Sequence, residues 1–258
     1  MSENDFYDIV LDLKSLSNLK EGFPIEYTEK GRKKINEFKN EYFSVITAIG
    51  NSKQGKSFIL SKISNINISS GHHINTNGLS ILFPDNYYLN KNYIIIDTEG
   101  TQNEIKIDNE IRNEMKKLTN IEKYKRIKEF FEDKQMTENF LQTFAIYSSN
   151  IVIAVISQFT LQEQKFLNRI KSILNRNREI YKNKDLFIIH NLMFLESKKQ
   201  VENYIKDTIE SSIFFKLEKT KIINFINIKN ENEKDGKMDY LFIEEIDDDE
   251  KKKIILFI

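Results

Sequence analysis

One stretch, residues 43–60 (FSVITAIGNSKQGKSFIL), constrains the fold of this chain more than any other. It begins with an apolar, β-branched segment typical of a buried strand, and it ends in apolar residues at helical spacing. Between these two segments lies GNSKQGKS, which has the form G-x-x-x-x-G-K-S. The sequence therefore predicts a strand, a phosphate-binding loop and a helix in direct succession.

The chemistry of this loop explains the choice of residues. Glycines at both ends let the backbone wrap around a phosphate chain with its N–H groups pointing inward, and the new helix adds the positive end of its dipole. Lys56 can reach the terminal phosphates, and Ser57 offers a hydroxyl group to Mg²⁺. The residues predicted to bind the nucleotide here are Gly50, Asn51, Ser52, Lys53, Gln54, Gly55, Lys56, Ser57 and Phe58. The alternative is an ordinary turn, but the chain has only 8 glycines in 258 residues, which makes a chance match improbable.

Composition excludes several classes of function. The 39 basic and 39 acidic residues cancel, so nothing points to binding of nucleic acid. The absence of cysteine excludes disulfides and thiolate metal sites. The N-terminus is acidic where a signal peptide would be basic, and no apolar run approaches the roughly 20 residues that span a bilayer. We therefore expect a cytoplasmic protein without a membrane segment.

Strand and helix patterns alternate along the chain. Strands are expected at 79–83, 93–96, 151–156, 186–189 and 240–243, and helices at 28–40, 140–147, from 161 onward and at 196–213. A charged segment at 102–134 is expected to be a mobile helical region on the surface. The alternation predicts an α/β fold of the P-loop NTPase type, with a mostly parallel sheet and helices on both faces. We expect a single domain over 1–258, in which 1–42 leads in, 43–191 carries the motifs and 192–258 completes the domain.

Two further motifs follow the loop at the expected positions. Asp97-Thr98-Glu99-Gly100 has the form D-x-x-G after a buried strand, so Asp97 can hold Mg²⁺ and the Gly100 amide can contact the γ-phosphate. Thr76 precedes a glycine in the intervening loop, where its hydroxyl can also bind Mg²⁺. The alternatives are a simple turn for D-x-x-G and a solvated threonine before a turn for Thr76.

The loop GNSKQGKSFIL, the TNGL of 76–79, IIIDTEGT of 94–101 and FAIYSSNIVIAVIS of 144–157 resemble the guanylate-binding-protein and atlastin type of large GTPase, in the dynamin superfamily. The resemblance covers roughly residues 43–191. It implies a GTPase domain with Mg²⁺ at Ser57 and Thr76, and often a nucleotide-dependent homodimer.

Three positions depart from that family pattern. Lys53 stands where the family usually has an arginine finger, and lysine lacks the planar fork of arginine. Ile74 stands where a water-positioning serine is common. The family reads guanine with an Arg-Asp pair, whereas this chain has His190-Asn191 at the end of the strand 186–189. Asn191 can hydrogen-bond a purine edge, and a merely structural role for the His-Asn pair is the alternative.

The sequence therefore predicts a Mg²⁺-dependent GTPase, slow or in need of assistance, in which Lys53, Lys56 and Thr76 act in catalysis and loops 69–80 and 97–134 switch with the nucleotide. Asp97 and Ser57 hold the metal, together with Thr76. Two other hypotheses stay open: a nucleotide-gated binding module with little turnover, and an ATP-binding protein.

Overall fold

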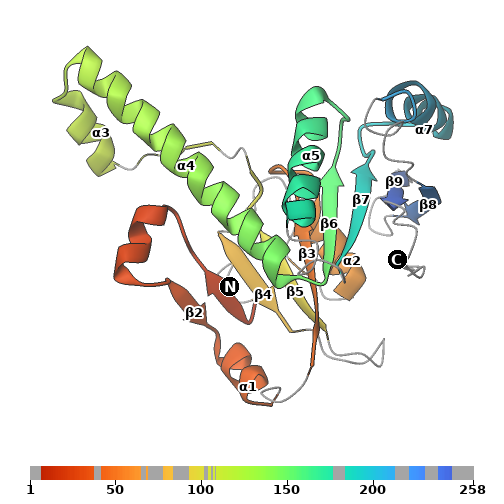
Figure 1. Cartoon of the computed structure of the whole chain (residues 1–258), viewed down its shortest axis with the longest axis horizontal. Helices are drawn as coiled ribbons and strands as arrows, with labels where there is room; N and C mark the ends of the chain where they lie inside the picture. The colour runs from red at the N-terminus through yellow and green to blue at the C-terminus, as the bar shows by residue number, and fades with distance from the viewer. Residues whose placement is uncertain are drawn as a thin grey trace.

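The computed structural model describes residues 7–37, 42–64, 68, 78–83, 93–101, 104–105, 107, 109–176, 184–212, 221–229 and 238–245. Its strands are β1 (Ile9–Leu11), β2 (Ile25–Tyr27), β3 (Ser44–Ile49), β4 (Leu79–Leu82), β5 (Tyr93–Thr98), β6 (Ile151–Ile156), β7 (Asp185–Asn191), β8 (Lys221–Lys229) and β9 (Met238–Glu245). Its helices are η2 (Leu16–Glu21), α1 (Glu29–Glu37), α2 (Lys56–Ser64), α3 (Asn109–Lys116), α4 (Asn120–Ser148), α5 (Leu161–Arg176), α7 (Lys198–Tyr204) and the π-helical η3 (Ile205–Ile209). Figure 1 shows how these elements are arranged.

All the strands belong to one nine-stranded sheet in the order β2-β1-β4-β5-β3-β6-β7-β9-β8. The four central strands β5, β3, β6 and β7 pair in parallel, and the strands on both flanks pair antiparallel. The predicted α/β fold with a parallel core is therefore confirmed.

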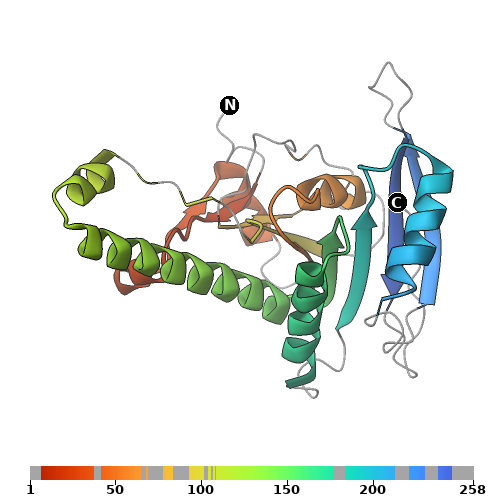
Figure 2. The same cartoon turned by 90° about the horizontal axis from the view of Figure 1, so that it is seen from above.

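Helices cover both faces of this sheet, as predicted. Figure 2 shows α2 on one side, with α4 and α5 on the other. Side chains of β6 alternate accordingly: Val152, Ala154 and Ile156 join the core beneath α4 and α5, whereas Ile153 and Val155 join the core beneath α2. Because β6 is buried on both faces, it is apolar throughout rather than alternating with polar residues.

The helix α4 differs from the sequence prediction. A charged surface segment up to residue 134 and a separate helix at 140–147 were expected, but α4 runs unbroken for 29 residues. A capping box between Thr119 and Glu122 starts it, and no proline or glycine interrupts it. Its C-terminal half packs on the core while its N-terminal half projects outward beside α3 (Figures 1 and 2). Among the described helices, α4 included, none is long and apolar enough to cross a membrane.

Other boundaries also shift. The strand β2 was not predicted, and neither was β8. The expected helix 196–213 is observed as α7 followed directly by η3, so it spans 198–209.

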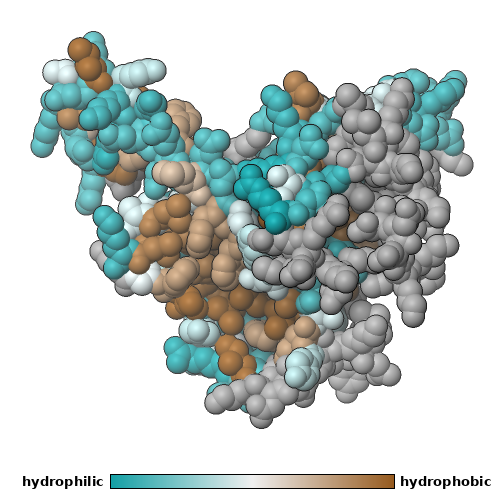
Figure 3. Space-filling model, in the orientation of Figure 1, coloured by the Kyte–Doolittle hydropathy of each residue, from teal (hydrophilic) through white to brown (hydrophobic). Residues whose placement is uncertain are grey.

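An apolar surface lies beside the C-terminal half of α4 in Figure 3, and α4 itself exposes Phe144 and Tyr147 there.

Candidate functional site

The loop between β3 and α2 contains backbone conformations and a close approach that favour glycine. Lys53 has a positive φ of 63°, and Gly55 has a φ of 88°, both in the left-handed region. A Cβ atom on Gly50 would lie 2.3 Å from the carbonyl oxygen of Val155 on β6. A glycine is therefore required at the first position by close packing and at the second by its φ angle.

Lys56 turns its side chain back into this loop. Its Nζ donates a 3.0 Å hydrogen bond to the carbonyl oxygen of Asn51, and only 6% of the residue is exposed. Burial lowers the pKa of Lys56, and the negative charges of Asp97 and Glu99 oppose that shift. The ammonium group therefore lies at the position where the tail of a triphosphate is expected.

Parallel pairing places Asp97 beside the loop. Strand β5 pairs with β3 so that Asp97 lies opposite Ala48, two residues before the loop begins. The fully buried carboxylate accepts hydrogen bonds from the hydroxyls of Ser57 and Tyr7, both at 2.7 Å to Oδ2. The structure thus brings together two of the three residues predicted to hold Mg²⁺.

This pair of oxygen ligands suits Mg²⁺. Magnesium keeps several waters and usually takes only one or two protein carboxylates, besides substrate phosphates. The described residues contain no group of three or more His, Cys, Asp or Glu side chains that could hold a metal ion by themselves. One buried carboxylate with one hydroxyl therefore fits a nucleotide-bound Mg²⁺ better than a metal held by the protein alone. The third predicted ligand, Thr76, lies outside the described residues, as does Ile74.

Gly100 packs directly against the phosphate loop. A Cβ atom on Gly100 would lie 2.4 Å from both N and Cα of Ser52. Two backbone hydrogen bonds join the same segments, from Ser52 N to Thr101 O at 2.8 Å and from Thr101 N to Gly50 O at 3.2 Å. The D-x-x-G segment and the phosphate loop are consequently one connected unit.

The residues expected to read the base lie in different environments. His190 is fully buried, and its ring packs edge-on against Phe159 with the centroids 5.5 Å apart. Nδ2 of Asn191 donates to the carbonyl oxygen of Gln54 at 3.0 Å, and a Cβ on Gly55 would meet that same nitrogen at 2.6 Å. The geometry favours the structural alternative for His190, and it makes Asn191 a support of the phosphate loop.

The remaining predicted loop residues vary in exposure. Lys53 is exposed, and Ser52 is partly buried. Phe58 belongs to α2, is partly buried and packs against the core on that side of the sheet, with Nζ of Lys62 5.5 Å from its ring centroid. The exposure of Lys53 fits a charge near the predicted phosphates, and it fits equally well the alternative of a solvated loop lysine.

Sequence reasoning missed two residues of this site. Tyr7 contacts Asp97 across 90 positions of the chain, and no motif marks it. Glu163 on α5 is buried and accepts hydrogen bonds from the side chains of Asn51 and Gln54. Burial raises the pKa of Glu163, against the effect of those hydrogen bonds and of the nearby His190. The only sequence signal at Glu163 is the T-x-x-E spacing that it forms with Thr160, just before the expected helix.

Glu99 connects the D-x-x-G segment to other parts of the fold. Its carboxylate forms an ion pair with Lys134 of α4 at 2.9 Å and accepts a hydrogen bond from the Gly78 amide at 3.2 Å. Its backbone N–H also donates to the carbonyl oxygen of Gly78 at 2.8 Å. Glu99 therefore links the end of the predicted 69–80 switch loop to the long helix.

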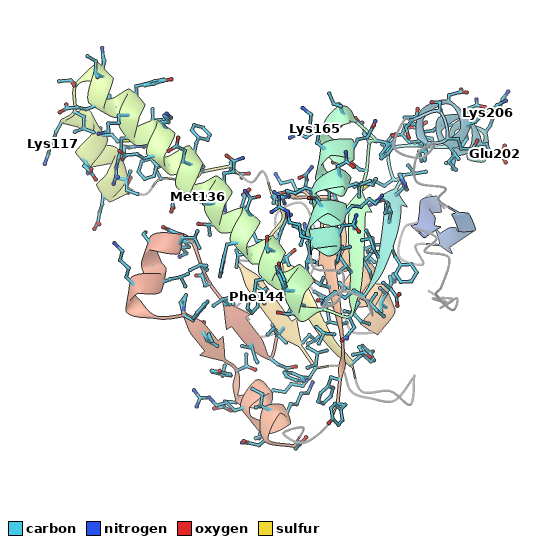
Figure 4. The ribbon with its side chains drawn as sticks, in the orientation of Figure 1. Lys117, Met136, Phe144, Lys165, Glu202 and Lys206 are labelled. Carbon is cyan, nitrogen blue, oxygen red and sulfur yellow. The ribbon has the colours of Figure 1, made fainter. Side chains whose placement is uncertain are left out.

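A pocket of about 230 Å³ opens beside the loop, between α4 and α5. Lys165 projects from α5 toward α4 in Figure 4, and the guanidinium of Arg169 donates to the side-chain oxygens of Asn139 and Gln142 on α4. The residues that line the pocket are Asn51, Thr101, Gln135, Glu138, Asn139, Gln162, Lys165, Phe166 and Arg169. Asn51 of the loop and Thr101, the residue after the D-x-x-G motif, therefore both reach this pocket.

The fold and the loop together define an α/β protein with a glycine-framed loop between a parallel strand and a helix. No family model matches the chain. The chain is 24% identical over 225 residues to a Dictyostelium discoideum protein named a heat shock protein, in a match that covers 80% of this chain. The chain spans only 30% of the length of that relative. A match of this extent leaves the function to be argued from the geometry of the site.

Proposed function

We propose that this chain binds a guanine nucleoside triphosphate with Mg²⁺ and hydrolyses its β–γ phosphate bond. The contact between Ser57 and Asp97 at 2.7 Å carries the proposal, because it joins the two predicted metal ligands at the carboxyl ends of β3 and β5. Lys56, buried within the same loop, supplies the positive charge that a triphosphate requires.

The residues would divide the work as follows. Backbone N–H groups of the loop and the first turn of α2 bind the phosphates, while Lys56 neutralises charge on the group being transferred. Ser57 and Asp97 hold Mg²⁺, which when bound supplies charge neutralisation at the phosphate oxygens. None of the described residues is an evident general base, but this reaction depends mainly on positioning and electrostatics. Lys53 in place of arginine favours slow turnover.

The choice of GTP over ATP rests on the family resemblance. Asn191 is occupied by Gln54, and His190 is buried, so neither gives independent support for a guanine-specific contact. Competition of GTP and ATP against a labelled GTP analogue decides between the two nucleotides. Stronger displacement by GTP supports the proposal, and stronger displacement by ATP replaces it with an ATP-binding protein.

Nucleotide binding itself is tested with Lys56→Ala in a calorimetric titration. We expect binding to be abolished, because Lys56 is the buried cation of the loop, whereas Lys53 is exposed. Lys62→Ala is the matched control, since Lys62 belongs to the same helix but lies over Phe58. Equal affinity of Lys56→Ala and the native chain for nucleotide would remove the proposal.

A nucleotide-gated binding module is the second candidate, and the bond between Glu99 and Lys134 favours it. That bond gives the nucleotide site a route to α4, whose projecting half exposes Ile121, Tyr124 and Phe131 (83%, 74% and 62%). Single-turnover phosphate release separates the candidates. Release that depends on Asp97 supports the GTPase, whereas bound but intact GTP supports the binding module. The nucleotide-dependent homodimer implied by the resemblance stays a prediction.

A further inference from the structure

Glu163 places a buried carboxylate directly behind the phosphate loop. Only 5% of the residue is exposed. Its Oε1 accepts a 2.9 Å hydrogen bond from Nδ2 of Asn51 and another from Nε2 of Gln54. These two residues occupy the second and fifth positions of the loop, so a single oxygen atom ties both of its sides to α5.

The Glu163 side chain bonds to the loop and not to the backbone N–H of Thr160, which would be its partner in a helix capping box. Thr160 and Glu163 have the T-x-x-E spacing of a capping box, as Thr119 and Glu122 do. At α4 the box is complete, because Glu122 accepts from the backbone N–H of Thr119. At α5 only half of it forms: Glu163 N donates to Thr160 Oγ1, but the Thr160 N–H bonds to the Gln158 carbonyl.

Glu122 at α4 is exposed and Glu163 at α5 is buried, and burial of a carboxylate is unfavourable without compensation. An exposed capping glutamate such as Glu122 would satisfy the helix end at much lower cost. Glu163 instead loses hydration and bonds to two amide groups of the loop. Helix capping therefore does not explain the buried position of the Glu163 carboxylate, whereas its hydrogen bonds to the loop do.

The contacts continue from Glu163 into a closed ring around the loop. Oε1 of Gln54 accepts from the backbone N–H of Asn51 at 2.9 Å, which bridges the loop from one side to the other. Oδ1 of Asn51 accepts from Oγ1 of Thr101 at 2.7 Å, which adds the segment after the D-x-x-G motif. The residues just before Gly55 and Lys56 are thus fixed by side chains as well as by the backbone.

We propose that Glu163 is a positioning residue for nucleotide binding: its carboxylate orients the Asn51 and Gln54 side chains and so presets the loop that receives the phosphates. The inference rests on the proposed nucleotide site. Glu163 contacts neither the expected phosphates nor the metal ligands, and it acts through the two amide side chains.

Conservative and disruptive variants separate this role from a general contribution to stability. Glu163→Gln keeps an oxygen that can accept both bonds, so we expect its affinity for GTP with Mg²⁺ to lie within about threefold of the native value. Glu163→Ala leaves a buried amide donor on Gln54 and a partly buried one on Asn51 without this acceptor, and we expect its affinity to fall by about tenfold or more. Gln164→Ala, at the next position of α5, is the matched control.

A double-mutant cycle gives the decisive readout. If Glu163 acts through Gln54, the losses of affinity in Gln54→Ala and Glu163→Ala will not multiply in the double variant. Leu141→Ala, a buried substitution on α4, controls for stability, because it should lower the melting temperature without changing the affinity. If Glu163→Ala does not fold, Glu163→Gln and Gln54→Ala still test the inference, which predicts native-like affinity for the first and weaker affinity for the second.

The outcomes also distinguish this inference from the proposed function. Absence of nucleotide binding by the native chain overturns the function, and with it the role assigned to Glu163. Binding by the native chain together with unchanged affinity in Glu163→Ala or Gln54→Ala overturns the positioning role alone. Multiplicative losses in the double variant would also overturn it, because they would mean that the two residues act independently.

Discussion

The hydroxyl of Ser57 donates a 2.7 Å hydrogen bond to Oδ2 of Asp97, although the two residues lie 40 positions apart in the chain. Parallel pairing of β3 with β5 produces this contact, because it places the C-terminal ends of both strands at the same edge of the sheet. The same carboxylate oxygen accepts the hydroxyl of Tyr7. One buried oxygen therefore joins the start of α2, the end of β5 and the N-terminal part of the chain.

Asp97→Asn should remove the effect of Mg²⁺ on this site. The amide keeps the size of the side chain and an oxygen that can accept from Ser57, but it loses the negative charge. We expect hydrolysis to fall roughly 100-fold and the gain in affinity on adding Mg²⁺ to disappear. Phosphate release and titrations with and without Mg²⁺ measure both effects, with Asp133→Asn as the control. A variant with native Mg²⁺ dependence would show that Asp97 does not serve the metal.

Gly100→Ala should disturb the phosphate loop by steric overlap alone. Gly100 is not among the glycines with positive φ, but its Cβ would lie 2.4 Å from the Ser52 backbone. We expect a loss of about 1–3 kcal/mol in the free energy of unfolding, together with weaker nucleotide binding. Gly22→Ala is the contrast, because Gly22 has a φ of 105° and open space around it. That variant should lose stability only; equal effects of the two substitutions on binding would contradict the packing argument.

Asn191→Ala should weaken GTP and ATP binding by the same factor. Loss of the 3.0 Å hydrogen bond to the Gln54 carbonyl relaxes the phosphate loop, which both nucleotides would share. A loss of about 3- to 10-fold is expected from one hydrogen bond of this kind. Affinities for both nucleotides measure it. A loss restricted to GTP would instead assign Asn191 to recognition of the guanine base.

Lys134→Ala should uncouple α4 from the nucleotide site. The pair of Lys134 and Glu99 is only about one-fifth exposed (21% and 18% for the two side chains), whereas Lys128 and Glu132 form a pair at the surface (67% and 59%). We expect GTP to slow amide hydrogen exchange in α4 of the native chain and of Lys128→Ala, but not of Lys134→Ala. Lys128→Ala should change stability by less than about 1 kcal/mol, whereas Lys134→Ala should cost more, because it leaves the largely buried Glu99 carboxylate without this cation. Persistence of the GTP effect in Lys134→Ala would exclude this route.

The pH dependence of stability should report the burial of Glu163. Burial raises the pKa of this carboxyl above its ordinary value of 4.5, so the folded state holds the proton more tightly than the unfolded state. The resulting stabilisation is complete below the ordinary pKa and is lost as the pH rises through the folded pKa. Denaturant unfolding measured across that pH range should show that the contribution of Glu163 to the free energy of unfolding falls as the pH rises. Glu163→Gln should remove this pH-dependent contribution. Glu196→Gln, at an exposed position, should leave the profile unchanged, and identical profiles for all three chains would contradict the prediction.

Local pattern was sufficient for much of the site. The run from β3 through the loop to α2 is continuous in sequence, so spacing alone placed Lys56 and Ser57 at the start of a helix. The apolar run of β6 likewise predicted a strand buried on both faces. Patterns failed where the signal was mixed: α4 is charged over its projecting half and apolar over its packed half, so one helix was predicted as two segments.

The sequence by itself therefore determined the glycine-framed loop between a strand and a helix, the position of the D-x-x-G segment at the end of a buried strand, and the alternation of strands and helices, because each depends on residues within a few positions of one another. Only the tertiary structure decided which distant side chains complete the site. Tyr7 and Glu163 reach it across 90 and up to 112 positions, and the role of Asn191 follows from its contact with Gln54 at a separation of 137. Such contacts depend on strand order and on which helix covers which face of the sheet, and hydrophobic periodicity does not encode them.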